Sequence, residues 1–160
     1  MTRLHPLPQQ QVLFSKMIYG NIYPLYAEGS WITHGTQENA PITELHKYRV
    51  LLVCGIARPQ PFINYIQKLT SHIDIIDYAD HHPFTTADIH HITQKAKHAD
   101  IVITTEKDAS KFAALQIPQT LRNKLCVQPI AVEFLDNDST LFHQTIIRYV
   151  TESQGNSPMD

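Results

Sequence analysis

From Arg49 onward, short apolar runs that predict strands alternate with stretches whose apolar residues recur at helical spacing. Strands are predicted at 49–54, 73–78, 101–104 and 125–134. A helix is predicted after each strand. The first begins at Pro59 and Pro61, the second is capped by Thr85 or Thr86, and the third runs from about Asp108 to Leu115. The fourth is capped by Asp138 or Ser139 and has the apolar residues Phe142, Ile146, Ile147 and Val150. Continuous apolar strands are typical of strands buried on both faces, and helical crossovers make such strands parallel. The pattern predicts an α/β fold, a Rossmann-like three-layer sandwich with a mainly parallel sheet.

The segment before this pattern has a different texture. Two β-prone runs, 12–17 and 22–26, flank Gly20 and predict a two-stranded ribbon, whereas 29–41 is rich in residues that break regular structure. Pro129 inside the fourth predicted strand lacks a backbone donor, which predicts an edge position or a bulge there. The predicted organisation is a β-ribbon or linker arm at 1–40, an α/β sandwich domain at 41–152 and a flexible tail at 153–160.

Composition narrows the classes of function. The chain has 160 residues and only five glycines, none of them clustered, so this sequence holds neither a Walker A loop, GxxxxGK(S/T), nor a GxGxxG turn. A net charge of −2 without a basic stretch argues against DNA or RNA as partner. No run of apolar residues reaches the ~18 that a membrane span needs, and the polar first residues do not resemble a signal peptide. The two cysteines lie in apolar runs, which predicts buried, reduced thiols. These features predict a cytoplasmic protein.

Polar residues are concentrated directly after three of the four predicted strands. Because the carboxyl ends of parallel strands meet at one edge of a sheet, where ligands bind in open α/β folds, we expect these residues to form one site. The candidates are Gly55 and Arg58 after the first strand; Asp80, His81 and His82 after the second; and Thr105, Glu106, Lys107, Asp108 and Lys111 after the third.

These candidates have functional and purely structural explanations. A carboxylate such as Asp80 beside the His81 imidazole can orient the ring and raise its basicity, as proton transfer near neutral pH requires. The same residues fit a turn in which the aspartate caps neighbouring amides, and Gly55 fits a tight strand-to-helix turn. Arg58 fits an exposed loop residue, and the charges from Lys107 onward fit a solvated helix start.

The Asp80-His81-His82 string also raises the possibility of a metal site, because Asp-His-His occurs in manganese-dependent phosphoesterases. Such sites need further carboxylates from other strand ends, often as Asp-x-Asp, and no predicted strand end here carries that string. A metal-dependent phosphoesterase is therefore kept as an alternative, and no residue is assigned as a metal ligand.

Three motifs in register carry a resemblance to a known family. GIARPQPF at 55–62, DYADHHPFTTADI at 77–89 and ADIVITTEKDASKF at 99–112 resemble the carboxyl-terminal half of tetraacyldisaccharide 4'-kinase, the lipid A 4'-kinase of Gram-negative bacteria. The upstream PLPQQQVLFSKMIYGNIYPLY at 6–26 is similar to the connecting segment of that family. The resemblance extends from Leu7 to Val150.

The resemblance implies ATP-dependent transfer of the γ-phosphoryl group to the 4'-hydroxyl of a tetraacyldisaccharide 1-phosphate, the lipid A disaccharide precursor. Family members have two α/β sandwich domains joined by a β-ribbon. Their amino-terminal domain carries the Walker A loop, the magnesium-binding carboxylates, a catalytic aspartate and the membrane-associating helix. ATP and Mg²⁺ are thus expected to bind mainly to that domain, which this sequence lacks. The complete enzyme is expected to act at the cytoplasmic face of the inner membrane. The chain alone is expected to be inactive.

The resemblance also implies roles for particular residues. Asp80 and His81 match the family's Asp-His pair, in which the histidine assists the catalytic base across the cleft between the domains. Other residues match motif positions of the family, but the resemblance assigns them no individual roles: Gly55, Arg58, Glu106, Lys107, Asp108 and Lys111. His82 and Thr105 are expected in the cleft beside them. Ser110 stands where many members carry valine. The alternative from a different class is a stand-alone α/β binding module without catalysis.

Overall fold

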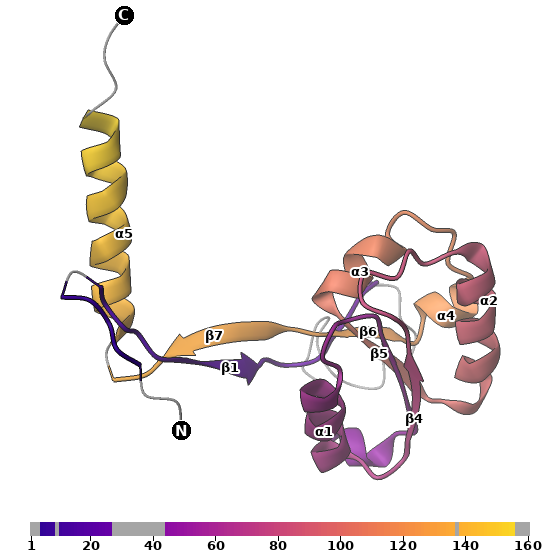
Figure 1. The fold of residues 1–160 in the computed structure, drawn as a ribbon. Helices are drawn as coiled ribbons and strands as arrows, with labels where there is room; N and C mark the ends of the chain where they lie inside the picture. The colour runs from indigo at the N-terminus through magenta and orange to yellow at the C-terminus, as the bar shows by residue number, and fades with distance from the viewer. Residues whose placement is uncertain (1–3, 9, 27–43, 137, 156–160) are drawn as a thin grey trace, which may run out of the picture. The chain divides into compact units, whose positions relative to one another are not determined.

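The computed structural model describes residues 4–8, 10–26, 44–136 and 138–155 (Figure 1). The chain divides into two units, Tyr19–Pro129 on the one hand and Met1–Ile18 with Ile130–Asp160 on the other. The elements in chain order are β1 (Ser15–Tyr19), β2 (Tyr23–Pro24), η2 (Leu45–Lys47), β3 (Val50–Cys54), α1 (Gln60–Leu69), β4 (Ile73–Asp77), α2 (Thr86–Lys95), η3 (Ala96–His98), β5 (Ile101–Thr105), α3 (Glu106–Phe112), α4 (Gln119–Arg122), β6 (Leu125–Gln128), β7 (Ile130–Phe134) and α5 (Asp138–Gly155).

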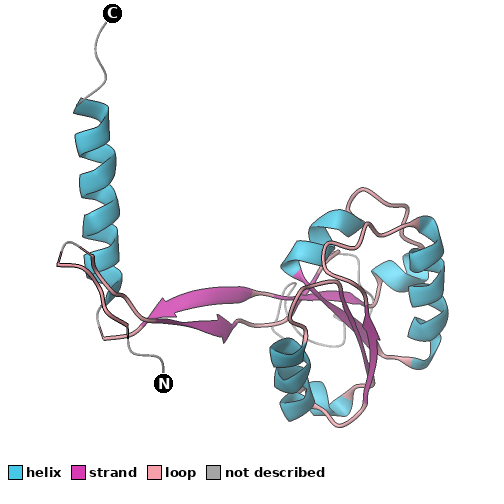
Figure 2. Ribbon diagram, in the orientation of Figure 1, coloured by secondary structure: helices cyan, strands magenta, loops and turns pink. Residues whose placement is uncertain are grey.

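The unit Tyr19–Pro129 is built on a five-stranded sheet in the order β2-β6-β5-β3-β4. Figure 2 shows strands of this sheet between helices. β3 pairs in parallel with both β4 and β5, and β5 pairs in parallel with β6, whereas the short β2 runs antiparallel to β6. The predicted α/β fold with a mainly parallel sheet is therefore confirmed. Parallel pairing places the carboxyl ends of β3, β4 and β5 at the same edge of the sheet, as the site requires.

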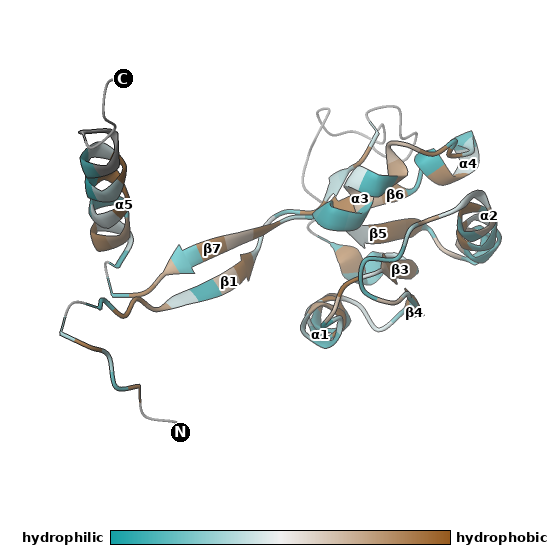
Figure 3. Cartoon of the chain, turned by 45° about the horizontal axis from the view of Figure 1, so that its top comes forward, coloured by the Kyte–Doolittle hydropathy of each residue, from teal (hydrophilic) through white to brown (hydrophobic). Residues whose placement is uncertain are grey.

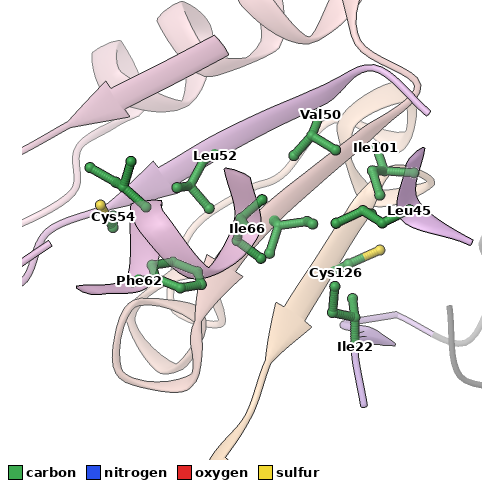
Figure 4. Packing of buried hydrophobic residues seen from close by; sticks show 11 residues of the cluster. Ile22, Leu45, Val50, Leu52, Cys54, Phe62, Ile66, Ile101 and Cys126 are labelled. Atoms are coloured by element: carbon green, nitrogen blue, oxygen red, sulfur yellow. The ribbon is translucent and has the colours of Figure 1, made fainter. Parts of the chain in front are cut away.

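Alternate residues of the interior strand β3 point to opposite faces of the sheet, and helices pack on each face. On one face, Leu52 and Cys54 join a core cluster with Phe62 and Ile66 of α1 (Figure 4). On the other face, Leu51 and Val53 join a second cluster with residues of α2, α3 and α4, among them Ile89, Ile92, Phe112 and Leu121. Helices on both faces of the sheet make three layers. β3 is buried at every position between them, which explains why its sequence is apolar throughout.

Two predictions about strand pairing are wrong. The runs 12–17 and 22–26 do not form a hairpin, because β1 pairs with β7 and β2 pairs with β6. The fourth predicted strand, 125–134, is two strands in different sheets, with Pro129 between them and β6 in the interior of its sheet. Around this junction the Gly20 N–H donates to the Pro129 carbonyl at 3.0 Å, and Nε2 of Gln128 donates to the Gly20 carbonyl at 2.7 Å.

The other unit comprises the β1–β7 ribbon and α5. Leu135 N–H donates to the Phe14 carbonyl, and Phe14 N–H donates to the Asp138 carboxylate at 2.8 Å, so the ribbon is joined to the start of α5. α5 runs through Gly155, past Ser153, where the tail was expected to begin, and 156–160 lie outside the described residues. The predicted loop at 29–41 and the boundary at 40/41 also lie outside them.

None of the described residues of this unit is buried, although many are apolar. On α5 the predicted apolar residues Phe142, Ile146 and Val150 recur every fourth position and are exposed. Figure 3 shows hydrophobic colouring on α5 and on parts of β1 and β7. Among the residues that the structure describes, no helix combines the length and hydrophobicity needed to cross a membrane.

Candidate functional site

Side chains and backbone groups from three loops meet at the carboxyl edge of β3, β4 and β5. Gly55 N–H, after β3, donates to the Asp108 carboxylate, after β5, at 2.8 Å. Nζ of Lys107 donates to Oδ1 of Asp80, after β4, at 2.9 Å, and Nζ of Lys111 donates to a main-chain carbonyl of the same loop at 3.3 Å. The structure therefore brings together residues that the sequence predicts to share one site.

Asp80, His81 and Lys107 form the exposed part of this cluster. Oδ1 of Asp80 accepts from Nζ of Lys107 and, at 3.0 Å, from the His81 N–H, while its Oδ2 lies 3.6 Å from Nε2 of His81. The hydrogen bond from Lys107 is the main cause that holds the pKa of Asp80 below its ordinary value. The His81 side chain is 78% exposed. An ionised carboxylate thus lies beside an imidazole that solvent or a ligand can reach.

His82, although it is the next residue, has a different environment. Its Nε2 lies 3.0 Å from Oδ2 of Asp88, and its ring stacks on Tyr78 with centroids 4.5 Å apart. Burial raises the pKa of Asp88, but hydrogen bonds from Thr85 and His82 outweigh burial, and the net pKa is lowered. His82 is therefore held by its neighbours within the β4–α2 loop.

Sequence reasoning missed Asp88. Its carboxylate accepts from the Thr85 N–H while the Thr85 hydroxyl accepts from the Asp88 N–H, which is a capping box at the start of α2. The Thr-x-x-Asp spacing was the available signal, and of the two predicted caps the structure has Thr85. The contact of Asp88 with His82 depends on the fold of the loop and has no local signature.

Asp108 forms the buried part of the cluster. Its side chain is completely buried, and Oδ2 accepts from the Gly55 N–H and, at 2.9 Å, from the Thr105 hydroxyl. Oδ1 accepts from Nζ of Lys111 at 3.0 Å. Thr105 is also the N-cap of α3, because its hydroxyl oxygen accepts from the Asp108 N–H. A buried carboxylate needs such partners, since desolvation of an unpaired charge is costly.

The remaining predicted site residues are Gly55, Arg58 and Glu106. A Cβ on Gly55 would lie 3.4 Å from both the Ala79 carbonyl oxygen and Oδ1 of Asp108, which is van der Waals contact, so the three loops leave little spare space at this position. Arg58 is exposed in the β3–α1 loop, and its side chain makes no hydrogen bond or ion pair with the residues that the structure describes. Glu106 is exposed at the first position of α3.

The described residues do not fit a magnesium ion or another divalent ion. No group of three or more histidine, cysteine, aspartate or glutamate side chains converges among them. The Asp80 and Asp108 carboxylates are each paired with a lysine, and Asp108 has no solvent access. Within the string 80–82, the two imidazoles face different carboxylates, Asp80 for His81 and Asp88 for His82.

The two cysteines lie in the core, as predicted, and both are free thiols. Burial, followed by the nearby Asp77 carboxylate, raises the pKa of Cys54 to about 12, and burial also raises the pKa of Cys126. The thiolate is the nucleophilic form of cysteine, so neither side chain is suited to nucleophilic catalysis at neutral pH.

Comparisons with known proteins agree on one family. The family model described as tetraacyldisaccharide-1-P 4'-kinase (LpxK) matches residues 11–150. Proteins named tetraacyldisaccharide 4'-kinase are 34% identical in Bacteroides thetaiotaomicron and 32% identical in Bacteroides fragilis, over 97% and 98% of this chain. One from Flavobacterium psychrophilum is 33% identical over 72% of the chain and 31% of its own length. The chain spans 42% of the length of each Bacteroides relative. No solved structure matches. The chain belongs to the tetraacyldisaccharide-1-P 4'-kinase family.

Proposed function

We propose that this chain is the carboxyl-terminal part of an ATP-dependent kinase that phosphorylates the 4'-hydroxyl of a tetraacyldisaccharide 1-phosphate in lipid A biosynthesis. Membership of the family supports the reaction class. The single observation that carries the proposal is the placement of an ionised Asp80 beside the exposed His81 at the carboxyl edge of the parallel sheet. Ligands of open α/β sheets bind at such an edge.

In this proposal His81 assists a catalytic base that another part of the enzyme supplies. Nε2 of His81 faces the Asp80 carboxylate, which orients the ring, so Nδ1 is the nitrogen that would share a proton with the base. Lys107 holds Asp80 ionised and in place. Phosphoryl transfer depends mainly on positioning and on stabilisation of charge, and this arrangement contributes to both.

The phosphate cradle is proposed to lie in the remaining portion of the enzyme. A kinase of this class needs a phosphate-binding loop, and the five glycines of this sequence are dispersed. The relatives are more than twice as long as the stretch that this chain matches. ATP with Mg²⁺, the lipid A disaccharide precursor and the cytoplasmic face of the inner membrane are therefore contacted mainly through that portion, and this chain alone is inactive.

The exposed apolar stripe of α5 supports the need for a further portion. Three apolar side chains, Phe142, Ile146 and Val150, lie on one side of the helix. The other described residues leave each of them more than a third exposed. Apolar surface gathered in this way is typical of an interface. We propose that the remaining portion of the enzyme covers this stripe.

A reconstitution assay tests the proposal. Transfer from radiolabelled ATP to tetraacyldisaccharide 1-phosphate is measured with this chain alone and with this chain combined with the amino-terminal portion of the Bacteroides thetaiotaomicron relative. Turnover is expected only in the combination. In the combination, His81→Gln and Asp80→Asn are expected to lower kcat by about 10²- to 10⁴-fold, the usual contribution of a positioned acid or base. His91→Gln, on an exposed position of α2, is the matched control.

Three outcomes contradict the proposal. Turnover by the chain alone at the rate of the combination would show that no further portion is needed. Reconstituted turnover that His81→Gln leaves unchanged would remove His81 from the mechanism. If the combination binds but shows no turnover under any condition, the chain is a binding module without catalysis.

A further inference from the structure

The turn that presents His81 has a strained backbone. His82 N–H donates to the Ala79 carbonyl at 3.1 Å, which closes a four-residue turn, and His81 occupies its third position with a φ of 59°. A side chain other than glycine at such a φ costs free energy, on the order of 1–3 kcal/mol, and persists only where the surroundings hold it. His81 itself is exposed, so the constraint comes from its neighbours.

The following residue, His82, provides the constraint through both its side chain and its backbone. Its ring lies against Tyr78 and its Nε2 against Asp88, as described above. Its main-chain carbonyl accepts from Nζ of Lys111 at 3.3 Å. His82 is therefore fixed on one side by α2 and on the other by α3.

The contact with α3 connects the turn to the buried carboxylate. Lys111 donates to the His82 carbonyl and to Oδ1 of Asp108, and Oδ2 of Asp108 accepts from the Gly55 N–H in the β3–α1 loop. The Lys111 side chain is 27% exposed, and its ammonium lies 5.4 Å from the Phe84 ring centroid. One pair of opposite charges thus connects all three loops of the site.

We infer that Lys111 and Asp108 are positioning residues, which act through the His82 carbonyl and the Gly55 amide to hold His81 in its left-handed conformation. This inference rests on the proposed function, in which His81 takes part in phosphoryl transfer. It gives the two residues a role that does not include contact with ATP or with the lipid precursor. A shift of about 1 Å in a group that takes part in the reaction can cost about 100-fold in rate, so such positioning bears on kcat.

The loss of Lys111 has a definite physical consequence. The His82 carbonyl loses the Lys111 donor, and the buried Asp108 loses the one cationic partner that it has among the described residues, so the three loops are no longer connected through one charge pair. The turn can then relieve the strain at His81 by rotation of its backbone to negative φ. The ring of His81 moves with the backbone, away from the Asp80 carboxylate.

The first experiment needs no activity and uses the whole 160-residue chain. Backbone chemical shifts and the three-bond amide coupling of His81 are measured by NMR in the wild type, in Lys111→Met and in Lys95→Met. Methionine keeps the length and the apolar part of the lysine side chain but removes the donor, and Lys95, at the exposed end of α2, is the matched control. We expect the left-handed signature of His81 in the wild type and in Lys95→Met, and its loss in Lys111→Met.

The second experiment uses the reconstituted enzyme. Lys111→Met is expected to lower kcat by about 10- to 100-fold while KM for ATP and for the lipid precursor stays within about twofold, because no substrate contact is removed. Lys111→Arg, which keeps a cationic donor, is expected to recover most of the rate. Asp108→Asn is expected to show the same split between kcat and KM; because it alters a buried charge, its folding is checked by circular dichroism.

The outcomes separate this inference from the proposed function. A wild-type His81 signature together with unchanged kcat in Lys111→Met overturns the inference, and so does an increase in KM without loss of kcat, which would mean a substrate contact. If His81→Gln has no effect on turnover while the NMR signature is lost in Lys111→Met, the positioning contacts exist but the proposed function is wrong. A lower melting temperature with unchanged kcat would show a purely structural role and also overturns the inference.

Discussion

The two units of this chain use their apolar residues in opposite ways. Every buried residue that the structure describes lies in Tyr19–Pro129, where a sheet has helices on both faces. The β1–β7 ribbon and α5 have apolar residues as well, but their side chains stay exposed or half-exposed. The difference teaches that hydrophobic content alone does not make a core. The first unit supplies its own second layer, whereas the described residues of the other unit form none.

The largest difference in stability between the units is expected when one phenylalanine of each unit is replaced by alanine. Phe112 of α3 is 1% exposed, whereas Phe142 of α5 is 37% exposed. Phe112→Ala is expected to lower the free energy of unfolding of Tyr19–Pro129 by about 3–5 kcal/mol, because it removes buried area and leaves a cavity. Phe142→Ala is expected to cost less than about 1 kcal/mol. Urea unfolding measures both, and equal losses would remove the distinction between the units.

A smaller effect is expected for a charge placed on the stripe of α5. Ile146→Asp leaves the stability of Tyr19–Pro129 unchanged but puts a carboxylate into the proposed interface with the remaining portion of the enzyme. Binding of that portion is expected to weaken by about 2 kcal/mol, which is about 30-fold in Kd. Isothermal titration calorimetry measures the change. Gln144→Asp, two residues along the same helix and off the stripe, should bind as the wild type does.

The smallest effect concerns acid stability. The folded-state pKa of Asp88 is lowered, so its contribution is fully present above the unfolded value of about 3.9 and is lost as pH falls through the folded value. Asp88→Asn is expected to lower the unfolding free energy by about 1 kcal/mol at neutral pH, as loss of a cap does, and to flatten the decline of stability below about pH 4.

The matched change in the other unit removes an exposed ion pair. Lys16 of β1 and Glu133 of β7 lie 3.0 Å apart, and both side chains are about half exposed. Lys16→Met is expected to change stability by at most about 1 kcal/mol, since solvent weakens such pairs. A loss equal to that of Asp88→Asn, in chemical denaturation at neutral pH, would mean that the ribbon is held more firmly than its exposure indicates.

The sequence was sufficient to predict the parallel part of the sheet and the edge at which the site lies. β3 is apolar at every position and β5 begins with three apolar residues, and such runs specify strands buried on both faces without reference to the rest of the chain. The pairing of β1 with β7 joins segments more than a hundred residues apart, and no local pattern specifies such a pairing. Pro129 indicated that the fourth predicted strand is interrupted. It did not indicate that the chain passes from one sheet to the other at this residue.

The same division applies within the site. The sequence placed Asp80, His81 and Lys107 at one edge, because strand order alone brings their loops together. It did not distinguish the exposed His81 from the anchored His82, because the partners of His82 come from α2 and α3 through tertiary contacts. It also left Asp108 without a role, since complete burial of a carboxylate cannot be deduced from a charged helix start.

The contact between Gly20 and Pro129 bears on how this chain could be rebuilt. The α/β unit begins at Tyr19 and ends at Pro129, and a hydrogen bond and the β2–β6 ladder hold its two ends next to each other. A unit whose ends meet has the topology of an insertion into the chain that surrounds it, and such units tolerate excision, exchange and circular permutation. A short linker in place of Tyr19–Pro129 would therefore still allow 15–18 of β1 to pair with β7. The α/β unit could in turn be exchanged between family members as a cassette.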